Sequence, residues 1–110
     1  MQQQDAEKIA KLNDEARQSL TGCRVFVTQG IRALEPELVK QIVERVRCFD
    51  DFNHGNDPYG EHDFGNIIIG EYTVFWKFDY YDLDLEMASL DPTDPTVTAR
   101  VLTVMMAEEY

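Results

Sequence analysis

Several features that would identify a familiar class of protein are scarce or missing from this sequence. The two cysteines, Cys23 and Cys48, form no CxxC pair, which argues against a metal or redox role for them. No stretch approaches the roughly 18 apolar residues that a membrane span requires. Residues 1–5 lack the basic start and the apolar stretch of a signal peptide. We therefore expect a cytoplasmic protein that does not bind a membrane.

The sequence motifs of well-known enzymes are missing as well. There is no HExxH, no EF-hand loop, no GxSxG elbow and no glycine-rich phosphate loop. The sequence therefore names no reaction. It favours a protein that is not an enzyme, and we predict no catalytic residue, no metal and no cofactor.

Basic residues are almost absent from the middle of the chain. Residues 50–94 contain twelve acids and a single base, Lys77, whereas residues 1–49 contain seven acids and eight bases. The middle stretch thus accounts for the whole net charge of −11. A field of one sign repels nucleic acid and anionic membranes, and it attracts basic surfaces or cations.

The chain has the length and apolar content of one folded domain, residues 1–110. With 110 residues, 44% of them apolar, it can bury one hydrophobic core. The spacing of apolar residues predicts amphipathic helices over residues 5–20 and 36–49. A β-branched and aromatic run predicts a strand over residues 24–28.

Residues 63–81 have the pattern of a β-hairpin. Gly70 and Glu71 supply a two-residue turn with glycine at its first central position. In the second arm, alternation places one almost purely apolar set of side chains on a face that we expect to be buried: Tyr72, Val74, Trp76, Phe78 and Tyr80.

The last part of the chain predicts a third helix. Asp94 is a suitable N-cap, Pro95 is a suitable first residue, and apolar side chains follow as far as Met106. Glu108 and Glu109 would then oppose the dipole at the end of this helix. The expected fold is α+β, with about three helices packed on one face of a small antiparallel sheet that has a central β-hairpin.

Residues 53–65 concentrate both histidines of the chain with three acids and three glycines. Histidine and carboxylate side chains bind zinc or iron, and a histidine beside an aspartate can act as a general base. His62 with Asp57, Glu61 or Asp63 is the candidate for either role. Residues 57–60, Asp-Pro-Tyr-Gly, match a type I turn, which favours a structural interpretation. A turn, a partner-binding loop and a metal or catalytic site all stay open.

Asp82, Asp84 and Glu86 alternate with apolar residues directly after the predicted hairpin. In an extended strand these carboxylates would lie on one face at intervals of about 6.6–6.8 Å. Duplex DNA carries a charge every ~1.7 Å, so twelve acids match the charge of roughly 20 Å of duplex. The pattern predicts a nucleic-acid mimic that occupies the basic surface of a nucleic-acid-binding protein and does not itself bind nucleic acid. The alternative is that the acids only keep a small domain soluble.

The predicted mimic would contact its partner through nine acids of the middle stretch. They are Asp50, Asp51, Asp57, Glu61, Asp63, Asp79, Asp82, Asp84 and Glu86.

Three blocks of sequence, NDPYGEHDFG, FWKFDYYD and DPTDPTVTARVLTVMMAEEY, together resemble a bacterial family catalogued as domain of unknown function 3768. The resemblance covers residues 12–110 approximately. The matching pattern includes His62 but not His54, which argues against a site with two histidine ligands. It also includes Arg100, which we expect to pair with Asp79 or Asp91 inside the acidic surface.

The resemblance implies no known activity. Members of the family are frequent on plasmids and other mobile elements, which is compatible with a role in counter-defence. On this basis we predict an inhibitor of a host defence complex of CRISPR type. The alternatives are a small metal-dependent or His-assisted enzyme built on residues 56–63, or an accessory protein unrelated to nucleic acid, with an apolar interface around Tyr59, Tyr80 and Tyr81.

Overall fold

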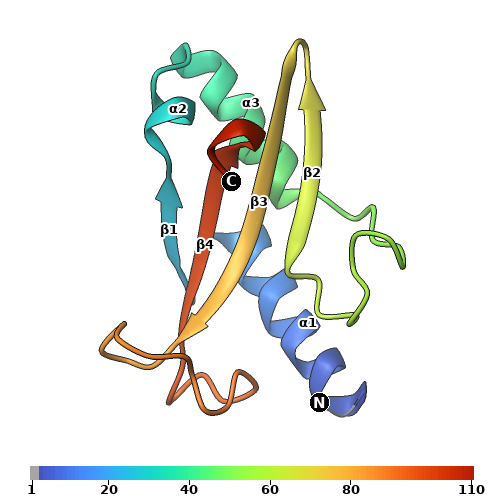
Figure 1. Ribbon diagram of the computed structural model, residues 1–110, viewed down its shortest axis with the longest axis vertical. Helices are drawn as coiled ribbons and strands as arrows, with labels where there is room; N and C mark the ends of the chain where they lie inside the picture. The colour runs from blue at the N-terminus through green and yellow to red at the C-terminus, as the bar shows by residue number, and fades with distance from the viewer. Residues whose placement is uncertain (1–2) are drawn as a thin grey trace.

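The computed structural model describes residues 3–110 and shows a four-stranded sheet with its helices on one face (Figure 1). Its elements follow the order α1 (Gln3–Ser19), β1 (Arg24–Val27), α2 (Gln29–Arg32), α3 (Pro36–Arg47), β2 (Phe64–Ile69), β3 (Tyr72–Tyr81), β4 (Ala99–Met106) and a short 3-10 helix, η1 (Ala107–Glu109). The strand order across the sheet is β1-β4-β3-β2.

The α+β class is confirmed, but the sheet is mixed and not wholly antiparallel. β4 runs antiparallel to β3, whereas β1 pairs with β4 in parallel. The predicted hairpin is present as β2 and β3, joined at Gly70, whose φ of 58° suits the first position of such a turn. Of the two hairpin strands only β3 is central, because β2 forms an edge of the sheet.

The core lies between the helices and one face of the sheet. The predicted alternation along β3 is confirmed, since Val74, Trp76 and Phe78 are all buried on this face. Ile42 and Val46 of α3 pack against the same cluster. In Figure 1, α1 and α3 lie behind the sheet, and among the described residues no α-helix covers its front face.

The helix predicted from Asp94 to the end of the chain is wrong, because residues 99–106 form β4 between β1 and β3. Both faces of this strand are largely covered: Leu102 and Val104 join the core, while Val101 and Met105 on the opposite face are also buried. A strand that is buried on both faces shows no polar alternation, so its sequence resembles a buried helix.

The residues that suggested the ends of this helix have other roles. One oxygen of Asp94 accepts hydrogen bonds from the backbone N–H and the hydroxyl of Thr96, at 2.9 and 2.6 Å, which closes a turn in place of an N-cap. Glu109 accepts hydrogen bonds from the Thr28 hydroxyl and from the N–H groups of Gly30 and Met106. It therefore ties the C-terminal residues to the segment that follows β1.

Candidate functional site

Two acid-rich loops meet the sheet at the same end. Residues 50–63 lead into the start of β2, and residues 82–98 join the end of β3 to the start of β4. Because β2 and β4 both run antiparallel to β3, these three points belong to the same end of the sheet, the lower one in Figure 1, where residues 50–63 lie beside β2 and residues 82–98 lie below β3 and β4. Each loop carries five acids and neither carries a lysine or an arginine. We call residues 50–63 and 82–98 together the acidic end.

The first loop is held against α1 by His62. Its Nδ1 lies 3.0 Å from both carboxylate oxygens of Asp14, and its Nε2 lies 3.7 Å from an oxygen of Asp57. The imidazole also stacks on the ring of Phe52, with centroids 3.9 Å apart and planes within 2° of parallel. Both ring nitrogens of His62 thus face carboxylates, which orient the imidazole between α1 and the first loop.

The turn predicted within this loop is confirmed. The Gly60 N–H donates to the carbonyl oxygen of Asp57 at 3.2 Å, as in a type I turn. The Asp57 carboxylate accepts a hydrogen bond from the His62 N–H, and this side chain is nearly enclosed. Asp57 therefore fixes the conformation of the loop.

A buried polar network extends from this loop to α1 and the sheet. The Asn13 amide donates to the Glu61 carbonyl and to the Tyr80 hydroxyl, at 3.0 and 2.8 Å. The Tyr80 hydroxyl donates to the Glu61 carboxylate, and the Arg100 Nε donates to the Asn13 side-chain oxygen at 2.7 Å. Burial raises the pKa of Tyr80, so the phenol stays protonated as the donor to Glu61.

Arg100 does not pair with Asp79 or Asp91, contrary to the prediction. Its Nη2 donates to the carbonyl oxygen of Pro92 at 2.6 Å, and its guanidinium lies 5.2 Å from the centre of the Tyr80 ring. Burial lowers the pKa of Arg100 from its usual value. Asp79 is paired with Lys77 at 3.0 Å, on the other face of the sheet.

The second loop is folded and not extended, so the predicted row of evenly spaced carboxylates is wrong. One oxygen of Asp82 accepts hydrogen bonds from the N–H groups of Glu86 and Met87, at 3.0 and 3.4 Å. Leu85 has a φ of 60°, which a strand does not contain. Asp84 and Glu86 nevertheless stay exposed to solvent.

The nine acids predicted to contact a partner differ in exposure. Four are exposed and three are half-buried, whereas Asp57 and Glu61 are each only 8% exposed. The exposed four are Asp50, Asp51, Asp84 and Glu86, and the half-buried three are Asp63, Asp79 and Asp82. The two buried acids position the first loop, and the exposed acids carry the charge that a partner would meet.

The donors proposed for a metal site do not come together. Among residues 3–110, no group of three or more histidine, cysteine, aspartate or glutamate side chains is arranged to hold a metal ion. Of the two thiols, Cys48 is exposed beside Glu44 and Cys23 is half-buried. His54 is exposed on the loop.

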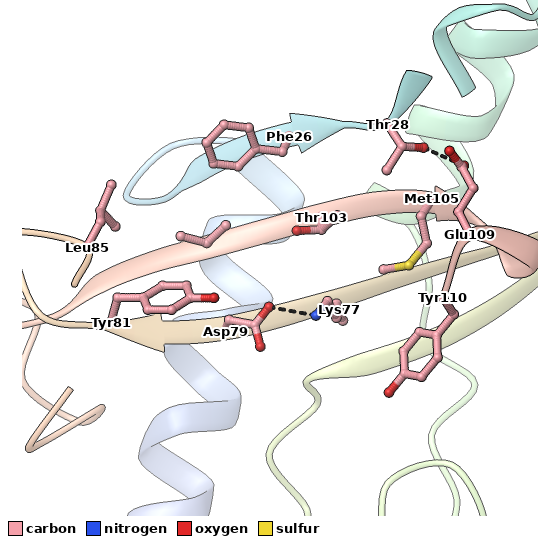
Figure 2. A pocket seen from close by; sticks show the side chains of 11 residues that line it. Phe26, Thr28, Lys77, Asp79, Tyr81, Leu85, Thr103, Met105, Glu109 and Tyr110 are labelled. Carbon is pink, nitrogen blue, oxygen red and sulfur yellow. Dashed lines mark hydrogen bonds and ion pairs between the residues drawn. The ribbon is translucent and has the colours of Figure 1, made fainter. Parts of the chain in front are cut away.

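A groove on the uncovered face of the sheet was not predicted from the sequence. The groove has a volume of about 560 Å³ and is lined by residues of β1, β3 and β4, by Leu85 and by Tyr110 (Figure 2). Its floor includes Val101 and Met105 of β4, which was predicted as a helix. Placing residues 99–106 in a strand would have revealed the groove.

The architecture and the charge distribution define a small acidic α+β protein with one uncovered sheet face. The chain belongs to the family described as "Protein of unknown function (DUF3768)", which matches residues 27–109 and confirms the resemblance noted in the sequence. No curated protein and no solved structure matches the chain. In residues 3–110, no helix is both long enough and apolar enough to cross a membrane.

Proposed function

We propose that this protein is a non-enzymatic binding protein whose acidic end docks on a basic, nucleic-acid-binding surface of another protein. The observation that carries the proposal is that two loops with ten acids, and no lysine or arginine, attach to the same end of the sheet, one beside β2 and the other below β3 and β4 (Figure 1). Such a surface attracts a cationic groove over a distance and accelerates association with it.

The internal contacts of the loops support this role because they hold the charges in place before binding. His62, Asp57 and Asn13 tie the first loop to α1 and to the sheet. Asp82 closes a tight turn in the second loop. A surface that is already ordered loses less conformational entropy on binding than a flexible acidic tail would.

The partner is a protein that normally binds DNA or RNA, and its surface is basic for that reason. The partner that we propose is a defence complex of CRISPR type in the cytoplasm, because the resemblance implies that members of the family are frequent on mobile elements. The occupied surface would be short, since the described molecule extends 39 Å along its longest axis.

The experiment is a pull-down from bacterial lysate at low salt with two matched variants. The test variant neutralises the four exposed acids of the acidic end: Asp50→Asn, Asp51→Asn, Asp84→Asn and Glu86→Gln. The control neutralises four exposed acids elsewhere, in the α3 start, the hairpin turn and η1: Glu35→Gln, Glu37→Gln, Glu71→Gln and Glu108→Gln. Both variants change the net charge by the same amount.

We expect the wild type and the control variant to retain nucleic-acid-binding proteins that moderate salt releases and that DNA or RNA displaces. The test variant should lose them while it keeps its fold by circular dichroism. Equal retention by both variants, at all salt concentrations, would contradict the proposal and favour an accessory role with an apolar interface.

A further inference from the structure

Exposed apolar side chains gather at the acidic end. The loop of residues 82–98 contains five leucine, methionine or valine residues, and all of them are exposed, with Leu90 fully so. They are Leu83, Leu85, Met87, Leu90 and Val97. Apolar residues that cluster on one exposed segment mark an interaction site more often than single exposed ones do.

This apolar surface continues into the groove on the uncovered face of the sheet. Leu85 lies at the end of the groove next to the acidic end, and Tyr110 lies near the other end (Figure 2). Phe26 of the edge strand β1 forms one side and is 53% exposed. The groove volume of about 560 Å³ falls in the usual range of binding sites for small groups and side chains.

The charged groups that line the groove already have partners. The Lys77 ammonium lies 3.0 Å from the Asp79 carboxylate. The Glu109 carboxylate accepts hydrogen bonds from the Thr28 hydroxyl at 2.6 Å and from the Gly30 N–H at 3.1 Å. Because these charges are satisfied internally, the groove offers mainly apolar and aromatic surface to an occupant.

We propose that the groove receives an apolar or aromatic side chain from a segment of the basic partner, in which lysines or arginines flank that side chain. This inference rests on the proposed function, since the acidic end would bind the flanking bases. The charge beside the groove argues for this occupant, because Leu85, which lines the groove, lies in the chain between the exposed carboxylates of Asp84 and Glu86.

A second copy of the chain fits the same groove less well. Each copy carries a net charge of −11, so a face-to-face pair brings together two molecules of the same charge. Like charges across an interface oppose association. A basic segment removes this repulsion and leaves the apolar contact available.

The test uses three synthetic peptides of equal length, titrated into the full-length protein labelled for NMR. The first has lysines around a central Leu-Phe-Leu, the second has the same lysines around Ser-Gly-Ser, and the third has glutamates around Leu-Phe-Leu. Methyl signals of Leu85, Val101 and Met105 report on the groove. Two variants accompany the wild type: Phe26→Thr in the groove, and Ile68→Thr, which removes an exposed apolar side chain on the other edge strand.

We expect the lysine peptide with the apolar centre to bind roughly tenfold or more tightly than the one with the polar centre, the factor that burying one large side chain provides. It should shift the groove methyls, and Phe26→Thr should remove most of the advantage while Ile68→Thr keeps it. The glutamate peptide should not bind.

The remaining outcomes separate the two proposals. Equal binding of both lysine peptides would overturn the groove inference and leave the acidic end as the binding surface. Binding of neither lysine peptide would contradict the proposed function as well. Binding of the glutamate peptide would show that the occupant is not a basic segment. Shifts of the groove methyl signals that grow with protein concentration, without any peptide, would show that the occupant is another copy of the chain.

Discussion

The Nε of Arg100 donates a 2.7 Å hydrogen bond to the side-chain oxygen of Asn13, across 87 positions of sequence. This contact joins the helix that covers the sheet to β4, the strand at its centre. The amide group of Asn13 also donates to the Glu61 carbonyl and to Tyr80, so one buried side chain links α1, the first acidic loop and two strands.

Replacement of Asn13 by leucine should therefore lower the free energy of unfolding by about 3 kcal/mol, because it leaves Arg100 and the other partners without their buried hydrogen bonds. Urea unfolding measures the change. Gln18→Leu removes an amide from the exposed face of the same helix and should change stability by less than about 0.5 kcal/mol. Similar losses in the two variants would show that the network contributes little.

Gly65 is required because Trp76 lies directly opposite it in the β2–β3 register. A Cβ atom added at residue 65 would collide with the indole ring, which is fully buried. We expect Gly65→Ala to cost roughly 1–3 kcal/mol, the usual result of overpacking a core. Thermal unfolding followed by circular dichroism tests this, a signal that does not depend on Trp76.

The collision also predicts that the two positions are coupled. In a background with Trp76→Leu, where the large ring is gone, the same Gly65→Ala change should cost less than it does in the wild type. Gly55→Ala is the control, since its added carbon meets only the end of the exposed Asn53 side chain. Equal costs of Gly65→Ala in both backgrounds would place its effect in the backbone and not in the contact with Trp76.

The sequence predicted well what depends on local periodicity. Val74, Trp76 and Phe78 alternate along β3 with a mostly polar set of residues, and this pattern alone placed them in the core. β4 was mistaken for a helix, because the apolar side chains on both of its faces are buried. Its sequence therefore lacks the alternation of polar and apolar residues that indicates a strand. The β-branched residues of the segment, Val101, Thr103 and Val104, favour a strand and were the signal that pointed to the correct structure.

The contacts that organise the candidate site could not be predicted in the same way. Asp14 and His62 are 48 residues apart, and nothing in the spacing of either indicates that they meet. The sequence pointed to Asp57, Glu61 or Asp63 as the partner of His62. Asp57 does lie beside the ring, but the carboxylate that meets its Nδ1 comes from α1 and was not predicted. Both acidic loops attach to the same end of the sheet because of the strand order. This order could not be predicted once β4 had been assigned as a helix.

Asp63 should make the protein less stable as the pH rises. Burial, with a smaller effect of the neighbouring Glu61 carboxylate, raises the pKa of Asp63 in the folded state. The folded protein then holds a proton that the unfolded chain releases, so stability falls between the unfolded pKa of about 3.9 and the higher folded pKa.

Asp63→Asn should consequently increase the free energy of unfolding at pH 7, and the gain should disappear below the pKa of the unfolded chain. Urea unfolding of both proteins from pH 3 to pH 8 measures the difference. Asp50→Asn removes the same charge from an exposed position. A gain for Asp63→Asn that does not vary with pH, or that equals the gain of the control, would rule out burial of the carboxylate as the cause.

Glu109 is expected to act in the opposite direction. The Thr28 hydroxyl, followed by the N–H groups of Met106 and Gly30, lowers the pKa of this carboxyl by donating hydrogen bonds to its charged form. Its contribution to stability is therefore complete above the unfolded pKa and is lost as the pH falls through the lower folded pKa. Glu109→Gln should lower the melting temperature at pH 7 and approach the wild type in acid.

The neighbouring Glu108→Gln is the matched control, because Glu108 is exposed and accepts none of these three hydrogen bonds. It should leave the melting temperature at pH 7 almost unchanged. Glu109 also lines the groove, so its loss should release the Tyr110 end of that site and broaden the NMR signals of Thr28 and Met105. A Glu109→Gln variant with unchanged melting temperature and unchanged signals would show that the C-terminal residues are held by the aromatic contacts of Tyr110 with Phe64 and Phe75 alone.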